Sequence, residues 1–141
     1  MISIRELHKH YKKNHALKDI NLEINDPGIY VILGPNGSGK TTLLKSIVGL
    51  VIPDKGEIRV GGTNVQDSPL YRNEISYLPQ IARFPDNLRV CELIRLIKDI
   101  RNQDGDEYPL IALFKLEPEM NKKLRSLSGG TMQKVNMVLG F

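Results

Sequence analysis

Residues 34–41 read GPNGSGKT, and no other part of this sequence restricts the architecture as strongly. They match the pattern G-x-x-x-x-G-K-[S/T] at every fixed position, between an apolar run at 29–33 and a helical pattern that begins near Gly39. Glycines let a backbone turn sharply enough for its N–H groups to surround a polyphosphate. These residues therefore predict a phosphate-binding loop that takes a nucleoside triphosphate.

Three side chains of this loop have predicted roles that follow from their chemistry. The Lys40 ammonium would contact the β- and γ-phosphates, and the Thr41 hydroxyl would coordinate Mg²⁺. Thr42 can donate a hydrogen bond toward the α-phosphate. A helix that begins near Gly39 would add the partial positive charge of its N-terminus.

A glycine-rich turn with a chance lysine is the alternative interpretation of this loop. The neighbouring patterns argue against it, because residues 29–33 (IYVIL) predict a buried strand and the segment after the loop has helical spacing. The apolar positions of that predicted helix are Leu43, Leu44, Ile47, Val48 and Leu50. A buried strand, a phosphate loop and a helix together predict an α/β phosphate-loop fold.

Composition sets broader limits on the protein. The chain has 141 residues, 40% of them hydrophobic, which is enough for one globular domain with a core. Its formal net charge is +4, but basic and acidic residues are interspersed, so no nucleic-acid partner is expected. The single cysteine, Cys91, lies on the apolar side of a helical pattern and predicts a buried thiol in a reducing compartment. No secretory leader or apolar run of about 20 residues is visible, so any membrane role would come through a partner.

The remaining elements follow from periodicity and turn residues. No internal repeat is visible, and a helical insert is expected over roughly 81–127. Strands are predicted at 3–7, 17–24, 57–60 and 75–78, turns at 8–15, 26–28, 53–56 and 61–64, and helical stripes at 90–100 and 110–116. The apolar stripe at 90–100 is expected to pack in the hydrophobic core and to have no direct functional role.

A second group of residues at 127–134, LSGGTMQK, opens another predicted helix. Ser128 is a favourable N-cap, and Gly129 and Gly130 would expose backbone N–H groups to a second anion. Alone, this pattern is weak evidence for a phosphate contact. Its weight rises because a phosphate loop lies upstream of it and a proline–glutamine pair, Pro79-Gln80, lies between the two. The predicted apolar side of this helix consists of Met132, Val135, Val138 and Leu139.

These motifs together resemble those of the ATP-binding cassette (ABC) ATPases, the nucleotide-binding domains of ABC transporters, and the resemblance covers the whole chain. It implies that Tyr11 stacks on adenine beside Ala16, and that Gln80 reaches Mg²⁺ and the attacking water. It also implies that Ser128, Gly129 and Gly130 contact the γ-phosphate of ATP held by the opposite subunit. The loop residues implied to bind nucleotide are Asn36, Gly37, Ser38, Gly39, Lys40, Thr41 and Thr42.

Simpler interpretations of the same residues stay open. Tyr11 could cover a strand edge, although an aromatic ring on a turn near the phosphate loop suits base stacking. His8, His10 and His15 could suggest a metal, but no cysteine or acidic ligand joins them at a recognisable spacing, and a solvated turn is favoured. Gln80 could be ordinary loop polarity, and only the resemblance gives it a function.

Three departures from the family pattern restrict what the resemblance implies. Thr131 replaces the usual glutamine of the second motif, which is expected to tune the dimer contact. Arg89 replaces a threonine cap three residues before Glu92, so the capping box is expected to be broken at a cost of about 1 kcal/mol. The chain ends at Phe141, before the acidic strand, catalytic glutamate and switch histidine that the family would carry. Hydrolysis is therefore expected of the complete protein, and the isolated piece is expected to be unstable or completed by other residues.

The resulting hypothesis is the N-terminal part of an ABC ATPase domain. It would comprise a core at 1–80, a helical subdomain at 81–127 and a signature helix at 128–141. The implied partners are ATP, Mg²⁺, a transmembrane permease subunit on the cytoplasmic face of the membrane, and a second ATP-binding subunit in a head-to-tail dimer. Met132 and Lys134 favour an exporter. The rival classes are a soluble ABC ATPase of DNA repair or translation, a phosphate-loop kinase or GTPase, and a non-catalytic ATP-dependent interaction module.

Overall fold

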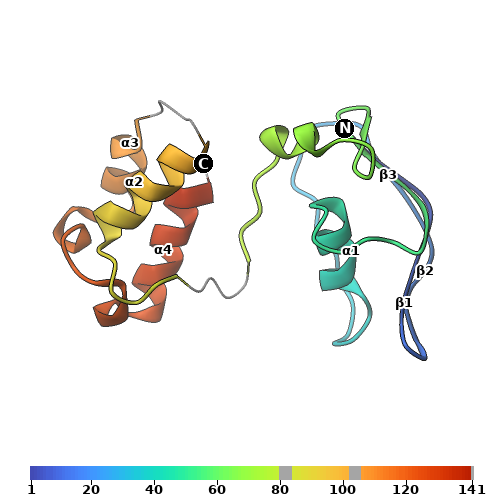
Figure 1. The fold of residues 1–141 in the computed structure, drawn as a ribbon, viewed down its shortest axis with the longest axis horizontal. Helices are drawn as coiled ribbons and strands as arrows, with labels where there is room; N and C mark the ends of the chain where they lie inside the picture. The colour runs from blue at the N-terminus through green and yellow to red at the C-terminus, as the bar shows by residue number, and fades with distance from the viewer. Residues whose placement is uncertain (80–83, 102–105, 141) are drawn as a thin grey trace. The chain divides into compact units, whose positions relative to one another are not determined.

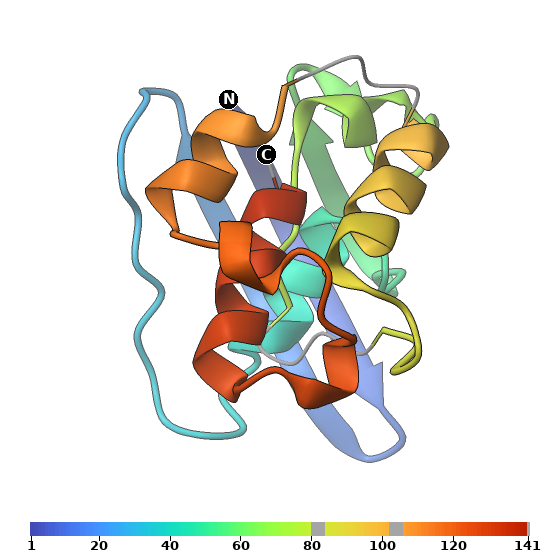
Figure 2. The ribbon, with the colours of Figure 1, turned by 90° about the vertical axis from the view of Figure 1, so that its left-hand side faces the viewer.

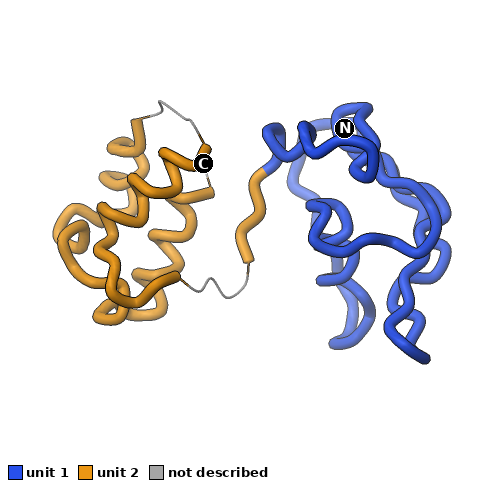
Figure 3. Tube along the Cα trace, in the orientation of Figure 1, with its two compact units in different colours: residues 1–75 blue, residues 76–141 orange. Residues whose placement is uncertain are grey.

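The computed structural model describes residues 1–79, 84–101 and 106–140. The chain forms two compact units, Met1–Ile75 and Ser76–Phe141, which Figure 3 shows in different colours. Each unit has a hydrophobic core of its own.

The first unit contains a four-stranded antiparallel sheet (Figure 1). Its order is β2-β1-β3-β4, with bounds Ile2–Tyr11 for β1, Asn14–Ile24 for β2, Lys55–Val60 for β3 and Thr63–Asn64 for β4. The strands predicted at 3–7, 17–24 and 57–60 are confirmed. The turn predicted at 8–15 is wrong, because β1 and β2 stay paired out to Tyr11 and Asn14 and only Lys12-Lys13 form the tip. An antiparallel sheet has a solvated face, which accepts the polar side chains that suggested a turn.

The register between β1 and β2 shifts at three places along the hairpin. Glu6 (φ 47°) and Asp19 (φ 50°) adopt left-handed backbone conformations where the pairing register shifts. The Asn21 side chain supports the backbone at the first shift, since its Oδ1 accepts a hydrogen bond from the Glu6 N–H at 2.8 Å. As a result, Ile4 and Leu7 are both buried although they are three residues apart on one strand.

Helix α1 (Lys40–Ile47) packs its apolar side against this sheet. The predicted helix is confirmed, with Leu43 and Ile47 buried, whereas Leu44 and Leu50 are exposed. A 3-10 helix, η1 (Pro69–Glu74), places Tyr71 in the same core. The buried core residues of this unit are Ile4, Leu7, Leu17, Leu43, Ile47, Ile58, Val60 and Tyr71.

Two predicted strands are absent from the described residues of the fold. Residues 29–33 form no strand and are exposed, from 40% at Ile32 to 97% at Ile29. Figure 2 shows this light-blue segment as an irregular trace. Residues 75–78 likewise form no strand. A strand needs a neighbour to pair its N–H and C=O groups, and among the described residues none pairs with either segment.

The described residues of the second unit form three α-helices: α2 (Val90–Arg101), α3 (Tyr108–Leu113) and α4 (Gly129–Gly140). Short 3-10 turns, η2 (Glu117–Glu119) and η3 (Leu124–Ser126), connect α3 to α4. The helical regions predicted around 90–100 and 110–116 and after Ser128 are confirmed. The core residues are Val90, Leu93, Ile94, Ile111, Leu116, Leu124, Val135, Val138 and Leu139.

Two predictions about α2 need correction. Cys91 is half-buried and not fully buried, because the helix turns it partly away from the core that Val90, Leu93 and Ile94 enter. Ile100 at the end of the predicted core stripe is 68% exposed.

Among the described residues, no helix combines the length and the apolar character needed to span a membrane.

Candidate nucleotide-binding site

The backbone of residues 34–39 forms an open loop in front of α1. Gly37 (φ 83°) and Gly39 (φ 90°) both have left-handed backbone conformations, which glycine adopts without strain. The Ser38 N–H donates to the Pro35 carbonyl at 3.3 Å and closes the turn between them. Asn36, Gly37 and Ser38 are all exposed to solvent. The glycine positions predicted from the sequence therefore coincide with the points where the chain reverses.

The Lys40 side chain folds back over this loop. Its ammonium donates to the carbonyls of Gly34 and Pro35, each at 2.7 Å, and lies 3.5 Å from Ser38 Oγ. The first residue of the helix therefore places a positive charge at the loop.

The N-terminus of α1 opens directly from the loop. Gly39 is its N-cap and accepts the first helical hydrogen bond, from the Leu43 N–H at 2.8 Å. Within the described residues, no side chain caps the helix, so the first-turn N–H groups of Lys40, Thr41 and Thr42 have no capping acceptor. Thr41 is exposed at this end. Free N–H groups, an ammonium and a hydroxyl together suit a polyphosphate that carries a divalent cation.

The hairpin contacts the loop through Ala16. A side chain on Gly39 would place its Cβ 2.3 Å from the Ala16 carbonyl oxygen and 3.1 Å from a methyl carbon of Leu17. Ala16 is half-buried and Leu17 is in the core. The structure therefore places Ala16 beside the start of α1, a contact that the sequence alone did not predict.

Tyr11 ends β1 at the tip of the same hairpin. Its side chain is 46% exposed, and the Lys9 ammonium lies 5.7 Å from the centre of the ring. Tyr11 is therefore on a strand and not on the flexible turn that was expected. Lys9 is a residue that the sequence interpretation missed, although its spacing of two from Tyr11 places both on one face of a strand.

The second phosphate-related motif caps α4. Ser128 Oγ accepts a hydrogen bond from the Thr131 N–H at 3.2 Å and lies 2.9 Å from Thr131 Oγ1. The prediction that Ser128 is an N-cap is confirmed. Gly129 and Gly130 are exposed, and a Cβ on either would have no atom within 4 Å among the described residues. This motif belongs to the second unit and the phosphate loop to the first.

One predicted site residue, Gln80, lies outside the described residues.

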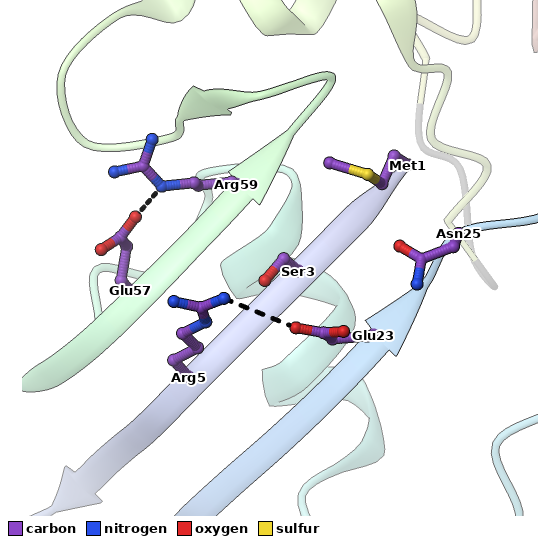
Figure 4. A pocket seen from close by; sticks show the side chains of 7 residues that line it. All are labelled: Met1, Ser3, Arg5, Glu23, Asn25, Glu57 and Arg59. Atoms are coloured by element: carbon purple, nitrogen blue, oxygen red, sulfur yellow. Dashed lines mark hydrogen bonds and ion pairs between the residues drawn. The ribbon is translucent and has the colours of Figure 1, made fainter.

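A pocket of about 270 Å³ lies on the solvated face of the sheet, away from the phosphate loop. Figure 4 shows side chains from three strands around it. Its charges are paired: Arg5 lies 3.6 Å from Glu23, and Arg59 pairs with Glu57. Because the charged side chains that line this pocket are paired with one another, the phosphate loop is the better ligand site.

Comparison with known proteins identifies the family. The family model described as ABC transporter matches residues 17–140, which is most of the chain. The chain belongs to the ABC transporter family. It is 33% identical over its whole length to the ABC transporter ATP-binding protein YtrB of Bacillus subtilis (strain 168), of which it covers 48%. It is also 35% identical to the spermidine/putrescine import ATP-binding protein PotA of Fusobacterium nucleatum subsp. nucleatum, with 96% of the chain and 38% of that protein covered. The chain thus spans about half the length, or less, of these relatives.

Solved structures confirm the predicted fold class, a phosphate-loop ABC ATPase cassette. The bacterial ABC transporter cassette MJ0796, determined as a dimer, matches all of this chain and 69% of its own, with a TM-score of 0.85 and 26% identity. The same cassette has been determined in a post-hydrolysis state with ADP and Pi. The expectation of an exporter is not supported, because relatives such as PotA are import proteins.

Proposed function

We propose that this chain is the nucleotide-binding part of the ATP-binding subunit of an ABC transporter. The complete protein would bind and hydrolyse ATP to drive transport through a membrane-embedded permease. The observation that carries the proposal is the loop at 34–39, with its two left-handed glycines, the Lys40 ammonium and the uncapped start of α1. Such a concentration of positive charge and free N–H groups is selective for a polyphosphate.

The triphosphate of ATP would bind to the ammonium, hydroxyl and N–H groups that line the loop. Lys40 would contact the β- and γ-phosphates, and the N–H groups of residues 37–42 would surround the chain of phosphates. Thr41, exposed at the helix start, would supply one ligand to Mg²⁺, with Gln80 as the second protein group. Mg²⁺ would neutralise phosphate charge when bound. Thr42 would donate toward the α-phosphate.

The adenine ring would lie against the hairpin tip. Tyr11 is nearly half-exposed and can offer a ring face, while Ala16 is held beside the loop by its contact with Gly39. These contacts join the base-binding and phosphate-binding elements within one unit. Lys9 lies near the Tyr11 ring and would favour an electron-rich partner there.

The start of α4 would contact the ATP of a second subunit in a head-to-tail dimer. Gly129 and Gly130 support this role because nothing within the described fold requires them. Neither has a left-handed backbone, and both have open space around them. Glycine destabilises a helix by about 1 kcal/mol relative to alanine, so two in one first turn favour close approach from outside. Ser128 would add its hydroxyl to that contact.

Loss of the γ-phosphate would remove the contacts that hold such a dimer together. Opening of the dimer would then move the permease partner, with the helical unit as its docking element on the cytoplasmic face of the membrane.

Calorimetry of Mg²⁺-ATP binding to the full-length protein tests the nucleotide site. Lys40→Ala should weaken binding by about 10- to 100-fold, because charge-assisted hydrogen bonds contribute about 1.5–3 kcal/mol. Lys45→Ala is the matched control, since it removes the same charge from the last turn of the same helix, away from the loop. Equal affinities of the two variants would contradict the proposed site.

A second experiment separates stability from dimer formation at α4. Gly130→Ala should stabilise the helical unit by up to about 1 kcal/mol, because alanine is the better helix former. The same substitution should weaken ATP-dependent dimerisation, measured by light scattering on a hydrolysis-deficient protein. Ser128→Ala should leave nucleotide binding intact and also weaken dimerisation. Dimerisation that is unchanged in both variants would rule out the contact in trans.

A further inference from the structure

All three histidines of the chain meet in one place on the β1–β2 hairpin. His10 and His15 are register partners whose rings stack with centroids 3.7 Å apart and 20° between planes. His8 Nδ1 lies 3.3 Å from His15 Nε2, which makes one ring a donor and the other an acceptor. A neutral pair can form that hydrogen bond, whereas two protonated rings carry donors only.

The surroundings of this cluster supply little negative charge. On the β3 side, Asp54 lies 3.1 Å from His10 Nδ1, but its carboxylate also accepts from the Lys9 ammonium at 2.9 Å. Lys55 is the register partner of His8 on β3, and Lys18 of β2 repels a charge on His15. On β2, the Asp19 carboxylate accepts from the Asn21 amide at 3.1 Å. Asp54 is therefore shared between Lys9 and His10, and no ion pair to His8 or His15 is present among the described residues.

The cluster is also close in the chain to the residues proposed to hold adenine. Tyr11 follows His10 directly, and Ala16 follows His15 directly. Both histidines are in the paired part of the hairpin next to the Tyr11–Asn14 pair that closes the tip. Repulsion between the two rings would therefore act on the strand ends that present Tyr11 and Ala16.

We propose that His8, His10 and His15 form a pH-sensitive clamp, whose protonation loosens the hairpin tip and thereby weakens nucleotide binding. This inference rests on the proposed nucleotide-binding function. Neutral rings stack and share a hydrogen bond, and this holds the two strands together. Protonated rings repel each other at these separations, with centroids 3.7 Å apart for His10 and His15 and 5.4 Å apart for His8 and His15, and the hydrogen bond between His8 and His15 is lost. By linkage, bound nucleotide would in turn disfavour protonation of the cluster.

The direction of the effect follows from His15. Desolvation, the neighbouring His10 and His8, and Lys18 lower the pKa of His15 below its usual 6.5. A histidine whose pKa is lower in the folded state binds its proton better when unfolded, so folding is favoured at higher pH. The contribution is complete above about pH 6.5 and is lost as the pH falls through the lower folded-state pKa.

The first test measures Mg²⁺-ATP affinity of the full-length protein at pH 7.5 and pH 5.5. His15→Gln and His15→Phe are the variants, because neither titrates and phenylalanine keeps a ring for stacking. The phosphates of ATP titrate equally with every protein, so only the difference between proteins is informative. The parent should lose about fivefold more affinity than either variant on acidification. Equal losses in parent and variants would overturn the proposal.

The second test needs no nucleotide. The protection of amides from hydrogen exchange should fall at Tyr11 and Asn14, the pair that closes the tip, between pH 7.5 and pH 5.5 in the parent and stay constant in His15→Phe. Unchanged protection in the parent would overturn the clamp whatever the affinities show. Because Lys40→Ala at pH 7.5 tests the nucleotide site separately, failure of that site and failure of the clamp are distinguishable.

Discussion

Gly37 and Gly39 have the same backbone conformation but different surroundings. Both have φ between 80° and 90°, where a Cβ is strained. A Cβ on Gly37 would have no atom within 4 Å among the described residues, whereas a Cβ on Gly39 would lie 2.3 Å from the Ala16 carbonyl oxygen. Gly39 therefore serves two purposes, the turn itself and the contact between the loop and the hairpin.

Alanine at each position should separate these two purposes. Gly37→Ala should destabilise the first unit by about 1–2 kcal/mol, the usual cost of a left-handed non-glycine residue. Gly39→Ala should cost about 1–3 kcal/mol more, because Ala16 must also move. Urea unfolding monitored on the hairpin checks this difference. Equal losses for the two variants would mean that the contact with Ala16 contributes nothing.

For individual residues, the sequence predicted the phosphate loop but not the residues that contact it or lie near it. The spacing of Gly37, Gly39 and Lys40 is local, so the chemistry of the loop can be inferred without a fold. The position of Lys9 near Tyr11 could have been inferred from strand alternation if the strand had been predicted to extend that far. The approach of Ala16 to Gly39 joins residues more than twenty positions apart, and no local pattern encodes it.

The N-terminus of α2 shows how one element compensates for a missing cap. Arg89 replaces a threonine, yet the Glu92 carboxylate still accepts from the Arg89 N–H at 2.8 Å. The loop before α4 supplies further acceptors, since Val90 donates to the Lys122 carbonyl at 3.2 Å and Cys91 to the Met120 carbonyl at 3.0 Å. The expectation of a broken capping box is therefore wrong in part: the half made by Glu92 remains, and backbone carbonyls accept from the first two N–H groups of the helix, Val90 and Cys91.

Glu92 is the side chain on which this helix start depends. Glu92→Ala should destabilise the helical unit by about 1 kcal/mol, because the Arg89 N–H loses its acceptor and the helix N-terminus loses a negative charge. Glu92→Gln keeps an acceptor oxygen and should cost about half as much. Thermal unfolding followed by circular dichroism measures both. An alanine variant as stable as the parent would show that the hydrogen bond is not needed.

Asp54 ties β1 to the residues before β3. Its carboxylate accepts from the Lys9 ammonium at 2.9 Å and from the His10 N–H at 2.6 Å, while its own N–H donates to the His8 carbonyl at 2.9 Å. The hydrogen bond from Lys9, followed by that from His10, lowers the pKa of Asp54 from 3.8 to about 2. The ionised carboxylate is thus the form that holds the two strands together.

The pH dependence of this tie has a definite sign. A carboxyl whose pKa is lower in the folded state stabilises above its unfolded pKa and ceases to do so as the pH falls through the folded value. Asp54→Asn should therefore lower the melting temperature at pH 7, and the difference from the parent should shrink between about pH 4 and pH 2. Melting curves of both proteins across this range test it. A difference that is independent of pH would point to packing and not to charge.

Local periodicity predicted the helices better than the strands. Helices satisfy their own hydrogen bonds, so the apolar spacing of α2 and α4 was sufficient evidence. Strands depend on partners distant in the sequence. The apolar run at 29–33 has strand composition but no pairing partner among the described residues, and the polar residues His8 and His10 are in a strand because β2 and β3 pair with β1.

For the molecule as a whole, the two units have separate cores. Leu7 is completely buried in the first, and Leu93 is 1% exposed in the second. Motif order was enough to predict the fold class because the cassette motifs occur in a fixed sequence. The relation between the two units is not encoded in such local patterns, and the two phosphate-related motifs lie in different units.

Separate cores predict separate responses to core substitutions. Leu93→Ala should destabilise the helical unit by about 2–5 kcal/mol and leave amide protection in β1 and β2 unchanged. Leu7→Ala should do the reverse. Residue-resolved hydrogen exchange on each variant measures both units at once. Equal loss of protection in both units from either substitution would show that the chain unfolds as a single cooperative body.

Cys91 is the single thiol of these 141 residues, and it is half-buried at the start of α2. A maleimide fluorophore or spin label would therefore attach to the helical unit at one known position. Paired with a second label introduced at the exposed Lys12 of the hairpin tip, it would report the distance between the two units by spectroscopy in solution. The cysteine thus offers a direct way to follow how nucleotide changes that distance.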